Sequence, residues 1–175
     1  MVDFTFETTY NQKALATMAR MLRKTVRRKH SRRSHIWGWI ITVMALFLVL
    51  PIGERELVFG LKTVITWIAI LAIIITLLWE DQINGYFARK RMLPGTDHAV
   101  CVFHEEGYIS ETAAGKTEWK YENIEVLAET KEYFTFVFGK NHAQVYDKNS
   151  LKGGSAEQFK TFLAEKTGKE IIQVK

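Results

Sequence analysis

Cys101 and His104 have the residue types of a metal site. Both fall on a strand expected over residues 98–104, where a spacing of three places side chains on opposite faces. They cannot bind one ion without a bulge, and Cys101 is expected to be a small buried apolar residue. The other histidines lie in a basic segment or alone near strand ends: His30, His35, His98 and His142. The sequence predicts no metal site.

Carboxylates and hydroxyls show no catalytic arrangement. Glu105 and Glu106 fall at an expected hairpin tip, a solvated position unsuited to acid catalysis. Gly153-Gly154-Ser155 precedes a helix and could bind an anion at its N-terminus, but no Lys-Ser/Thr follows and an ordinary loop is favoured. Further glutamates are expected among lysines on exposed strand faces: Glu118, Glu122, Glu125, Glu129 and Glu132. We therefore expect no enzyme, no catalytic residue and no cofactor.

The charges of the chain are segregated. Residues 1–35 carry nine Lys and Arg against two acids, residues 36–79 are almost uncharged, and residues 96–175 carry ten Lys against thirteen acids. This asymmetry fits a membrane protein better than a nucleic-acid-binding protein. The single cysteine excludes an internal disulfide and a multi-cysteine zinc site.

Two apolar runs dominate the middle of the chain, at residues 36–52 and 57–79. Each is long enough to cross a bilayer as a helix, which takes about 17–25 residues. Gly53-Glu54-Arg55-Glu56 between them suits a tight turn. The alternative, a soluble protein with a buried helical hairpin, is disfavoured because residues 68–78 are apolar on every face and little chain remains to cover them. A transmembrane hairpin over 36–79 is predicted.

The residues at the ends of these apolar runs are of the types enriched at a membrane interface. Trp37, Trp39 and Trp79 stand where an aromatic belt is expected, and Arg89, Lys90 and Arg91 follow the second run. The basic residues before the first run are Arg20, Arg23, Lys24, Arg27, Arg28, Lys29, Arg32 and Arg33. The positive-inside rule then predicts a multi-pass plasma-membrane protein with both termini in the cytoplasm.

The N-terminal arm, residues 1–35, reads as a strand at 3–9 and an amphipathic helix at 11–30. Its basic face could lie on the anionic inner leaflet of the bilayer. Alternatively, its apolar stripe packs on the cytoplasmic domain while the charges set the topology. Both interpretations stay open, and nucleic-acid binding is disfavoured because the membrane already accounts for the basic run.

After a helical linker at 80–95, residues 96–175 predict a small α+β domain. Strands are expected near 98–104, 107–112, 116–121, 124–130, 132–139 and 142–147. Ser155 and Gln158 form a capping box for a last helix, Gly168 suits its end, and a short strand could follow over 169–174. A bent antiparallel sheet or barrel closed by a C-terminal helix is the outline of a pleckstrin-homology-like (PH-like) domain.

Four segments make the chain resemble the YcxB-like family of bacterial membrane proteins. They are Trp119–Ile124, Glu129–Phe134, Val145–Leu151 and Phe159–Leu163. The resemblance implies an N-terminal arm, two transmembrane helices and a PH-like domain at the inner face of the plasma membrane. It implies no particular activity.

The leading functional hypothesis is a membrane-anchored, non-enzymatic interaction protein. Its PH-like domain would bind a protein partner or anionic lipid headgroups, and small residues in the spans could support a homo-oligomer. One alternative is an immunity protein that protects the cell from a toxin or membrane-active peptide. Another is a subunit of an oligomeric transporter.

Overall fold

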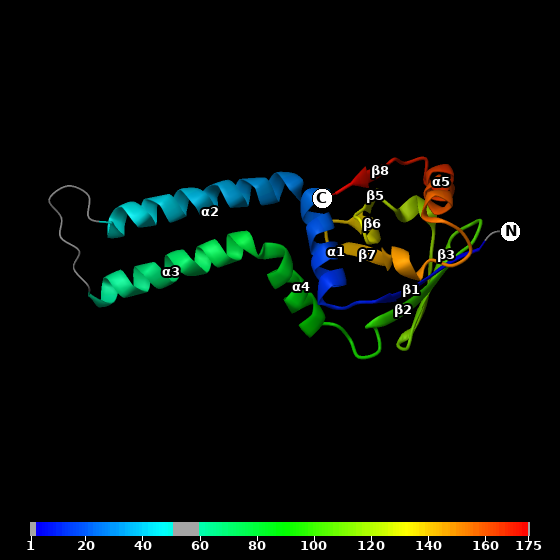
Figure 1. Cartoon of the computed structure of the whole chain (residues 1–175), viewed down its shortest axis with the longest axis horizontal. Helices are drawn as coiled ribbons and strands as arrows, with labels where there is room; N and C mark the ends of the chain where they lie inside the picture. The colour runs from blue at the N-terminus through cyan, green and yellow to red at the C-terminus, as the bar shows by residue number, and fades with distance from the viewer. Residues whose placement is uncertain (1–2, 51–59, 175) are drawn as a thin grey trace.

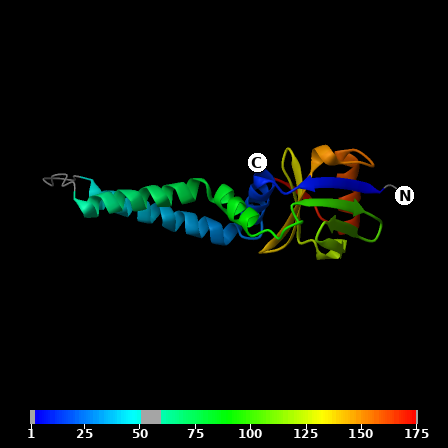
Figure 2. The ribbon, with the colours of Figure 1, turned by 90° about the horizontal axis from the view of Figure 1, so that it is seen from below.

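Two long helices, α2 (Arg28–Val49) and α3 (Leu61–Leu78), run side by side and project from a folded unit that the rest of the chain forms (Figures 1 and 2). The computed structural model describes residues 3–50 and 60–174. The expected turn at 53–56, and the ends of the two expected spans that adjoin it, lie outside the described residues.

The folded unit contains three further helices and eight strands among the described residues. The helices are α1 (Gln12–Lys24), α4 (Glu80–Lys90) and α5 (Ala156–Thr167). The strands are β1 (Phe4–Thr9), β2 (His98–Phe103), β3 (Tyr108–Thr112), β4 (Gly115–Trp119), β5 (Val126–Glu129), β6 (Tyr133–Gly139), β7 (His142–Asp147) and β8 (Ile171–Gln173). Short 3₁₀ turns occupy Tyr121–Asn123 and Lys148–Ser150.

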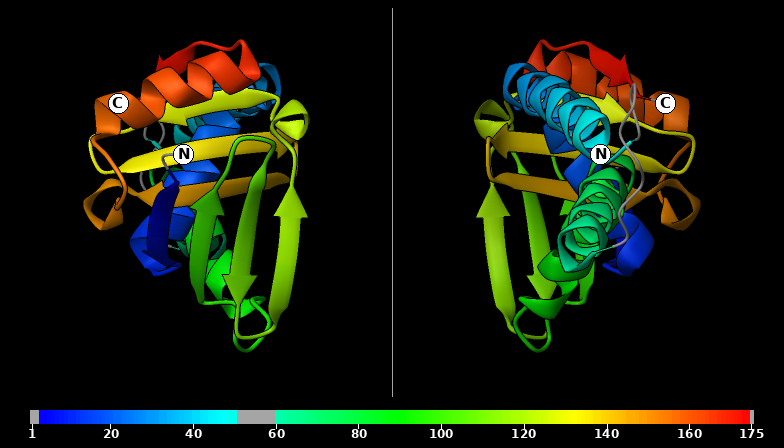
Figure 3. Two further views of the ribbon diagram at one scale, coloured as in Figure 1. Left: turned by 90° about the vertical axis from the view of Figure 1, so that its right-hand side faces the viewer. Right: turned by 90° about the vertical axis from the view of Figure 1, so that its left-hand side faces the viewer.

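The strands form two four-stranded sheets, in the orders β1-β2-β3-β4 and β7-β6-β5-β8. Their strands cross one another (Figure 3). Pairing is antiparallel except between β5 and β8. The α+β class is confirmed, but the expected single bent sheet or barrel is wrong: the described strands do not close into a barrel. The 3₁₀ turn at Tyr121–Asn123 separates β4 from β5, so β5 starts a second sheet.

Aromatic side chains from both sheets make the core. Phe6 and Phe103 of the first sheet lie against Phe134, Phe136 and Tyr146 of the second, with ring centroids 5.4–6.1 Å apart. Such pairs contribute roughly 0.5–1.5 kcal/mol each beyond their buried area. Phe134 and Phe136 are buried and form the core face of β6.

Helix α5 covers one side of this core with Phe159 and Leu163. Its predicted capping box is present, because the Ser155 hydroxyl accepts from Gln158 N and the Gln158 side chain accepts from Ser155 N. Gly168 ends the helix at φ 65°, a left-handed conformation that favours glycine. The last predicted strand forms as β8.

Helix α1 packs across the outer face of the second sheet. Met21 contacts Ala128 and Val174, while Leu22 contacts Val137. The outer face of β6 is therefore buried as well as its core face. The second interpretation of the arm holds for its apolar stripe, which packs on the folded unit and does not face lipid.

The helix expected over 11–30 divides at Thr25–Arg27, and this part of the prediction is wrong. The Thr25 hydroxyl donates to Met21 O, and the Arg27 guanidinium donates to Lys140 O and Asn141 Oδ1, each at 2.6 Å. These contacts hold the bend against the β6–β7 turn. The basic run from Arg28 therefore belongs to the same helix as the first apolar run.

Helix α4 lies on the opposite side of α1 from the sheet. Gly85 permits the approach, since a Cβ there would lie 2.7 Å from Ala16 N. The residues expected to act as a linker are thus packed against the folded unit. Because α2 follows α1 and α3 leads into α4, the start of α2 and the end of α3 both lie at this packed base (Figure 1).

Candidate functional site

A buried ion pair joins α1 to α4 at the base of the long helices. The Arg23 Nε and Nη2 donate to the two Asp81 oxygens at 2.7 and 2.6 Å, and Arg20 Nε lies 3.5 Å from Asp81 Oδ2. Asp81 is 6% exposed. Its hydrogen bonds raise the pKa of Arg23 above the ordinary value, against the opposing effect of burial. This bidentate contact fixes the angle between the two helices.

A second polar contact joins α2 to α4. His35 Nε2 lies 2.6 Å from Glu80 Oε2, and the same Glu80 oxygen lies 3.6 Å from Arg23 Nε. This contact therefore fixes the position of the first turns of α2 next to the end of α3. Side chains from α1, α2 and α4 therefore meet next to the start of α2 and the end of α3.

The structure divides the predicted basic arm into two groups. Arg20, Arg23 and Arg27 serve internal contacts, as described above. The others lie on the surface at the α1–α2 junction or on the first turns of α2: Lys24, Arg28, Lys29, Arg32 and Arg33. In the described part of the chain, Arg28 and Arg32 pair with no acid.

An open cavity of about 570 Å³ lies between the α1–α2 junction and β8. One wall is basic and polar, and the other comes from the end of the chain. The lining residues are Arg23, Lys24, Arg28, Ser31, Arg32, His35, Ile172, Gln173 and Val174. Among these described lining residues none is acidic. Sequence reasoning missed this cavity, because nothing local to β8 signals that it lies beside the basic arm.

The expected interface tryptophans are exposed near the base of the long helices, with Trp37 58%, Trp39 44% and Trp79 48% exposed. Arg89, Lys90 and Arg91 are placed elsewhere, at the far end of α4, where Arg89 lines a hollow with Tyr10. The structure therefore groups the tryptophans with the basic start of α2 but separates them from the second basic cluster.

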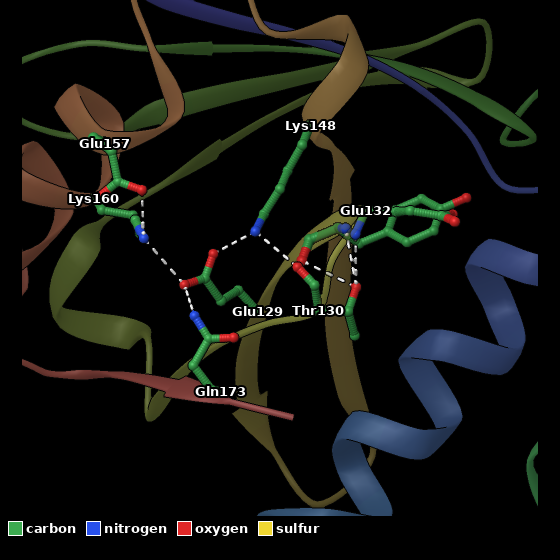
Figure 4. A network of polar contacts seen from close by, with 8 residues as sticks. Glu129, Thr130, Glu132, Lys148, Glu157, Lys160 and Gln173 are labelled. Atoms are coloured by element: carbon green, nitrogen blue, oxygen red, sulfur yellow. Dashed lines mark hydrogen bonds and ion pairs between the residues drawn. The ribbon is translucent and has the colours of Figure 1, made fainter. Parts of the chain in front are cut away.

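A buried carboxylate, Glu129, lies within the folded unit next to Gln173 of β8 (Figure 4). Glu129 is 2% exposed, so the expectation of an exposed strand position is wrong. Its Oε2 accepts from Lys148, and its Oε1 accepts from Lys160 at 3.3 Å and from Gln173. The contacts with Glu157 and then Glu129 raise the pKa of Lys160, against burial.

The contacts of Glu129 stabilise the fold and leave no free carboxylate oxygen for catalysis. Glu129 ends β5, a strand flanked by β6 and β8, and its partners come from α5, β8 and the turn after β7. Both carboxylate oxygens are satisfied by charged or amide donors, which is what a buried acid requires. The contacts of Glu129 thus join β5, α5, β8 and the turn after β7.

Residues 103–163 match the family model described as YcxB-like protein. This part of the chain is YcxB-like. The matched residues include all four segments on which the resemblance rested, so the expected family is confirmed there. Neither a curated protein nor a solved structure matches the chain.

The YcxB-like segment contains most of the aromatic core and Glu129 with its two lysines. Every residue that lines the basic cavity lies outside this segment, in the N-terminal arm, in β8 or at Val174 just after β8. The family match thus covers the part of the folded unit from the end of β2 into α5 and says nothing of the cavity.

Cys101 and His104, the first candidates for chemistry, do not converge. Cys101 is buried, its thiol donates to Ser110 Oγ at 3.3 Å, and burial raises its pKa to about 11. His104 instead faces Asp3, 3.1 Å away. Within residues 3–50 and 60–174, no group of three His, Cys, Asp or Glu side chains is placed to hold a metal ion.

Proposed function

We propose that this chain is a membrane-anchored, non-enzymatic interaction protein that displays its α+β unit at the cytoplasmic face of the plasma membrane. One observation carries the proposal: the apolar side chains of α2 and α3 point outward. The exposed ones include Ile36, Ile40, Ile41, Met44, Phe47, Leu48, Leu61, Ile65, Ile68, Leu71, Ile75 and Leu78. Soluble monomers rarely expose a continuous apolar patch of more than a few hundred Å².

Helix α3 has the dimensions of a span. Its 18 residues rise about 27 Å at 1.5 Å per residue, close to the roughly 30 Å of a bilayer core. By length and composition it is the one described helix that qualifies, and its side chains are mostly exposed. Helix α2 starts with a basic stretch and becomes apolar at Ile36, and we infer that its apolar part accompanies α3 through the bilayer.

The charge distribution supports the orientation. The exposed basic residues at the start of α2 lie on the same end of the hairpin as the folded unit, and the positive-inside rule places that end in the cytoplasm. The exposed tryptophans near the same base suit the interface. Both termini would then be cytoplasmic.

The folded unit would be the interaction module. Two crossing sheets with a capped helix after β7 support a PH-like interpretation of its architecture. Its carboxylate Glu129 is fully engaged and its Cys101 thiol is buried, so neither is available to a substrate. Residues 96–175 carry more acids than bases, which favours a protein partner over an anionic surface for this part of the chain.

Site-specific labelling of the full chain in membranes tests the proposal. Single cysteines at Lys29, Leu71 and Glu54 would be introduced into a Cys101→Ala background, with Glu54 outside the described residues. A membrane-impermeant maleimide should label Glu54→Cys in intact cells, Lys29→Cys only after permeabilisation, and Leu71→Cys in neither case. Labelling of Leu71→Cys in aqueous extracts, or of Lys29→Cys in intact cells, would refute the anchor or its orientation.

A further inference from the structure

We propose that the cavity between the α1–α2 junction and β8 binds the phosphate of one anionic phospholipid headgroup. The inference rests on the proposed membrane placement and adds a specific ligand site to it. Four features of the cavity support it: its charge, its depth relative to the apolar helices, its apolar wall and its size.

The charge of the cavity fits a phosphate. Arg28 and Arg32 are four residues apart on α2 and so lie on one face of the helix. Arg23 is neutralised by Asp81 and Glu80, whereas Arg28 and Arg32 have no acidic partner among the described residues. A phosphate between two guanidinium groups can accept bidentate hydrogen bonds and relieve their mutual repulsion.

The depth of the cavity fits a headgroup. Arg32 precedes Ile36, the first apolar residue of α2, by about 6 Å along the helix axis, and Arg28 precedes it by about 12 Å. The headgroup layer is roughly 5–8 Å thick on each side of the bilayer. Arg32 would therefore lie within this layer and Arg28 at its aqueous edge.

The opposite wall of the cavity distinguishes a lipid from a soluble anion. Ile172 is 48% exposed there, whereas Val174 beside it is buried, with 8% of its surface exposed. A free phosphate would leave Ile172 facing water, whereas the glycerol ester backbone of a lipid would cover it. The Ser31 hydroxyl, which has no partner among the described residues, adds a donor to the basic wall.

The size of the cavity also favours a lipid headgroup over a small ion. Its volume of about 570 Å³ falls within the roughly 300–1,000 Å³ typical of small-molecule sites. That volume accommodates a glycerophosphate group with a further polar substituent. Inorganic phosphate would fill only a small part of it.

The test counts lipids bound to the full chain. The protein would be purified in a nonionic detergent, and native mass spectrometry would measure retention of phosphatidylglycerol and of phosphatidylcholine. Wild type is expected to retain one phosphatidylglycerol per chain and to prefer it over phosphatidylcholine. The double variant Arg28→Gln/Arg32→Gln should weaken this binding by at least about tenfold, since it removes two charge-assisted contacts.

The matched control is Lys29→Gln/Arg33→Gln, which removes the same charge one position further along the same helix but outside this cavity. It should change phosphatidylglycerol retention less than about twofold, a change expected of diffuse surface charge alone. A third variant, Ser31→Leu, fills the cavity without changing charge and should also reduce retention. Far-ultraviolet circular dichroism confirms that each variant is folded.

Three outcomes would overturn the headgroup site. If Arg28→Gln/Arg32→Gln and Lys29→Gln/Arg33→Gln lose the same share of bound phosphatidylglycerol, the binding reflects a general charge effect. If wild type retains phosphatidylglycerol and phosphatidylcholine equally, the cavity has no headgroup preference. Displacement of phosphatidylglycerol by inorganic phosphate at matched concentration would assign the site to a soluble anion. The membrane proposal is judged separately by the cysteine labelling, so either idea can fail alone.

Discussion

The buried carboxylate offers the sharpest test of how the folded unit is stabilised. Glu129→Gln keeps the shape of the side chain but removes its charge. Lys148 and Lys160, whose side chains are only 17% and 25% exposed, would then lose their buried anionic partner. Breaking a buried ion pair in this way costs roughly 3–5 kcal/mol. Because both lysines can partly reach water, we expect the lower end, about 3 kcal/mol.

A matched control lies three residues away. Glu132 pairs with Lys13 at the surface, where its side chain is 42% exposed. Exposed pairs contribute roughly 0–1 kcal/mol, so Glu132→Gln should change stability little. The same chemical substitution is therefore expected to differ several-fold in effect between the two positions.

Thermal unfolding of the full chain in detergent, followed by near-ultraviolet circular dichroism, measures the difference. For a folded unit of this size, 3 kcal/mol corresponds to a fall in Tm of about 10 °C, against about 2 °C or less for Glu132→Gln. A double-mutant cycle of Glu129→Gln with Lys148→Met should give a coupling energy above about 1 kcal/mol. Equal shifts for the two glutamate variants, or additive effects in the cycle, would refute the reasoning.

Four further measurements test other contacts. Gly85→Leu should destabilise the protein by at least about 2 kcal/mol in chemical unfolding, because its side chain meets the backbone of Ala16, while Gly60→Ala, with open space around it, should be close to neutral. Arg23→Gln leaves a buried carboxylate of α4 without its bidentate partner and should cost about 2–3 kcal/mol in the same assay, since a second arginine remains nearby. The raised pKa of Cys101 predicts slow alkylation of the folded protein at pH 8 and fast alkylation in denaturant. Because the thiolate is disfavoured only in the folded state, stability should be intact below about pH 9 and fall as pH rises toward 11, which unfolding at a series of pH values measures.

Much of the architecture follows from local sequence. Alternating apolar residues predict most strands to within two or three residues, because the period of two is set by the backbone alone. Ser155, Gln158 and Gly168 predict the bounds of α5, because capping involves groups within a few residues of one another. The long apolar run of α3 likewise identifies its helix without reference to the rest of the chain.

Tertiary structure alone decides the environment of Glu129 and the cavity. Glu129 resembles its neighbours in sequence, and its burial depends on Lys148, Lys160 and Gln173, each brought to it by a different element. The cavity depends on the parallel pairing of β8 with β5, which carries the end of the chain beside a basic segment more than a hundred residues earlier. Such proximity has no local signal, because it arises from the packing of α1 on the sheet and from the bend that follows α1. The sequence by itself therefore determined the elements and the separation of charge, while the packing of distant elements determined which charges are buried, which are paired and which line a cavity.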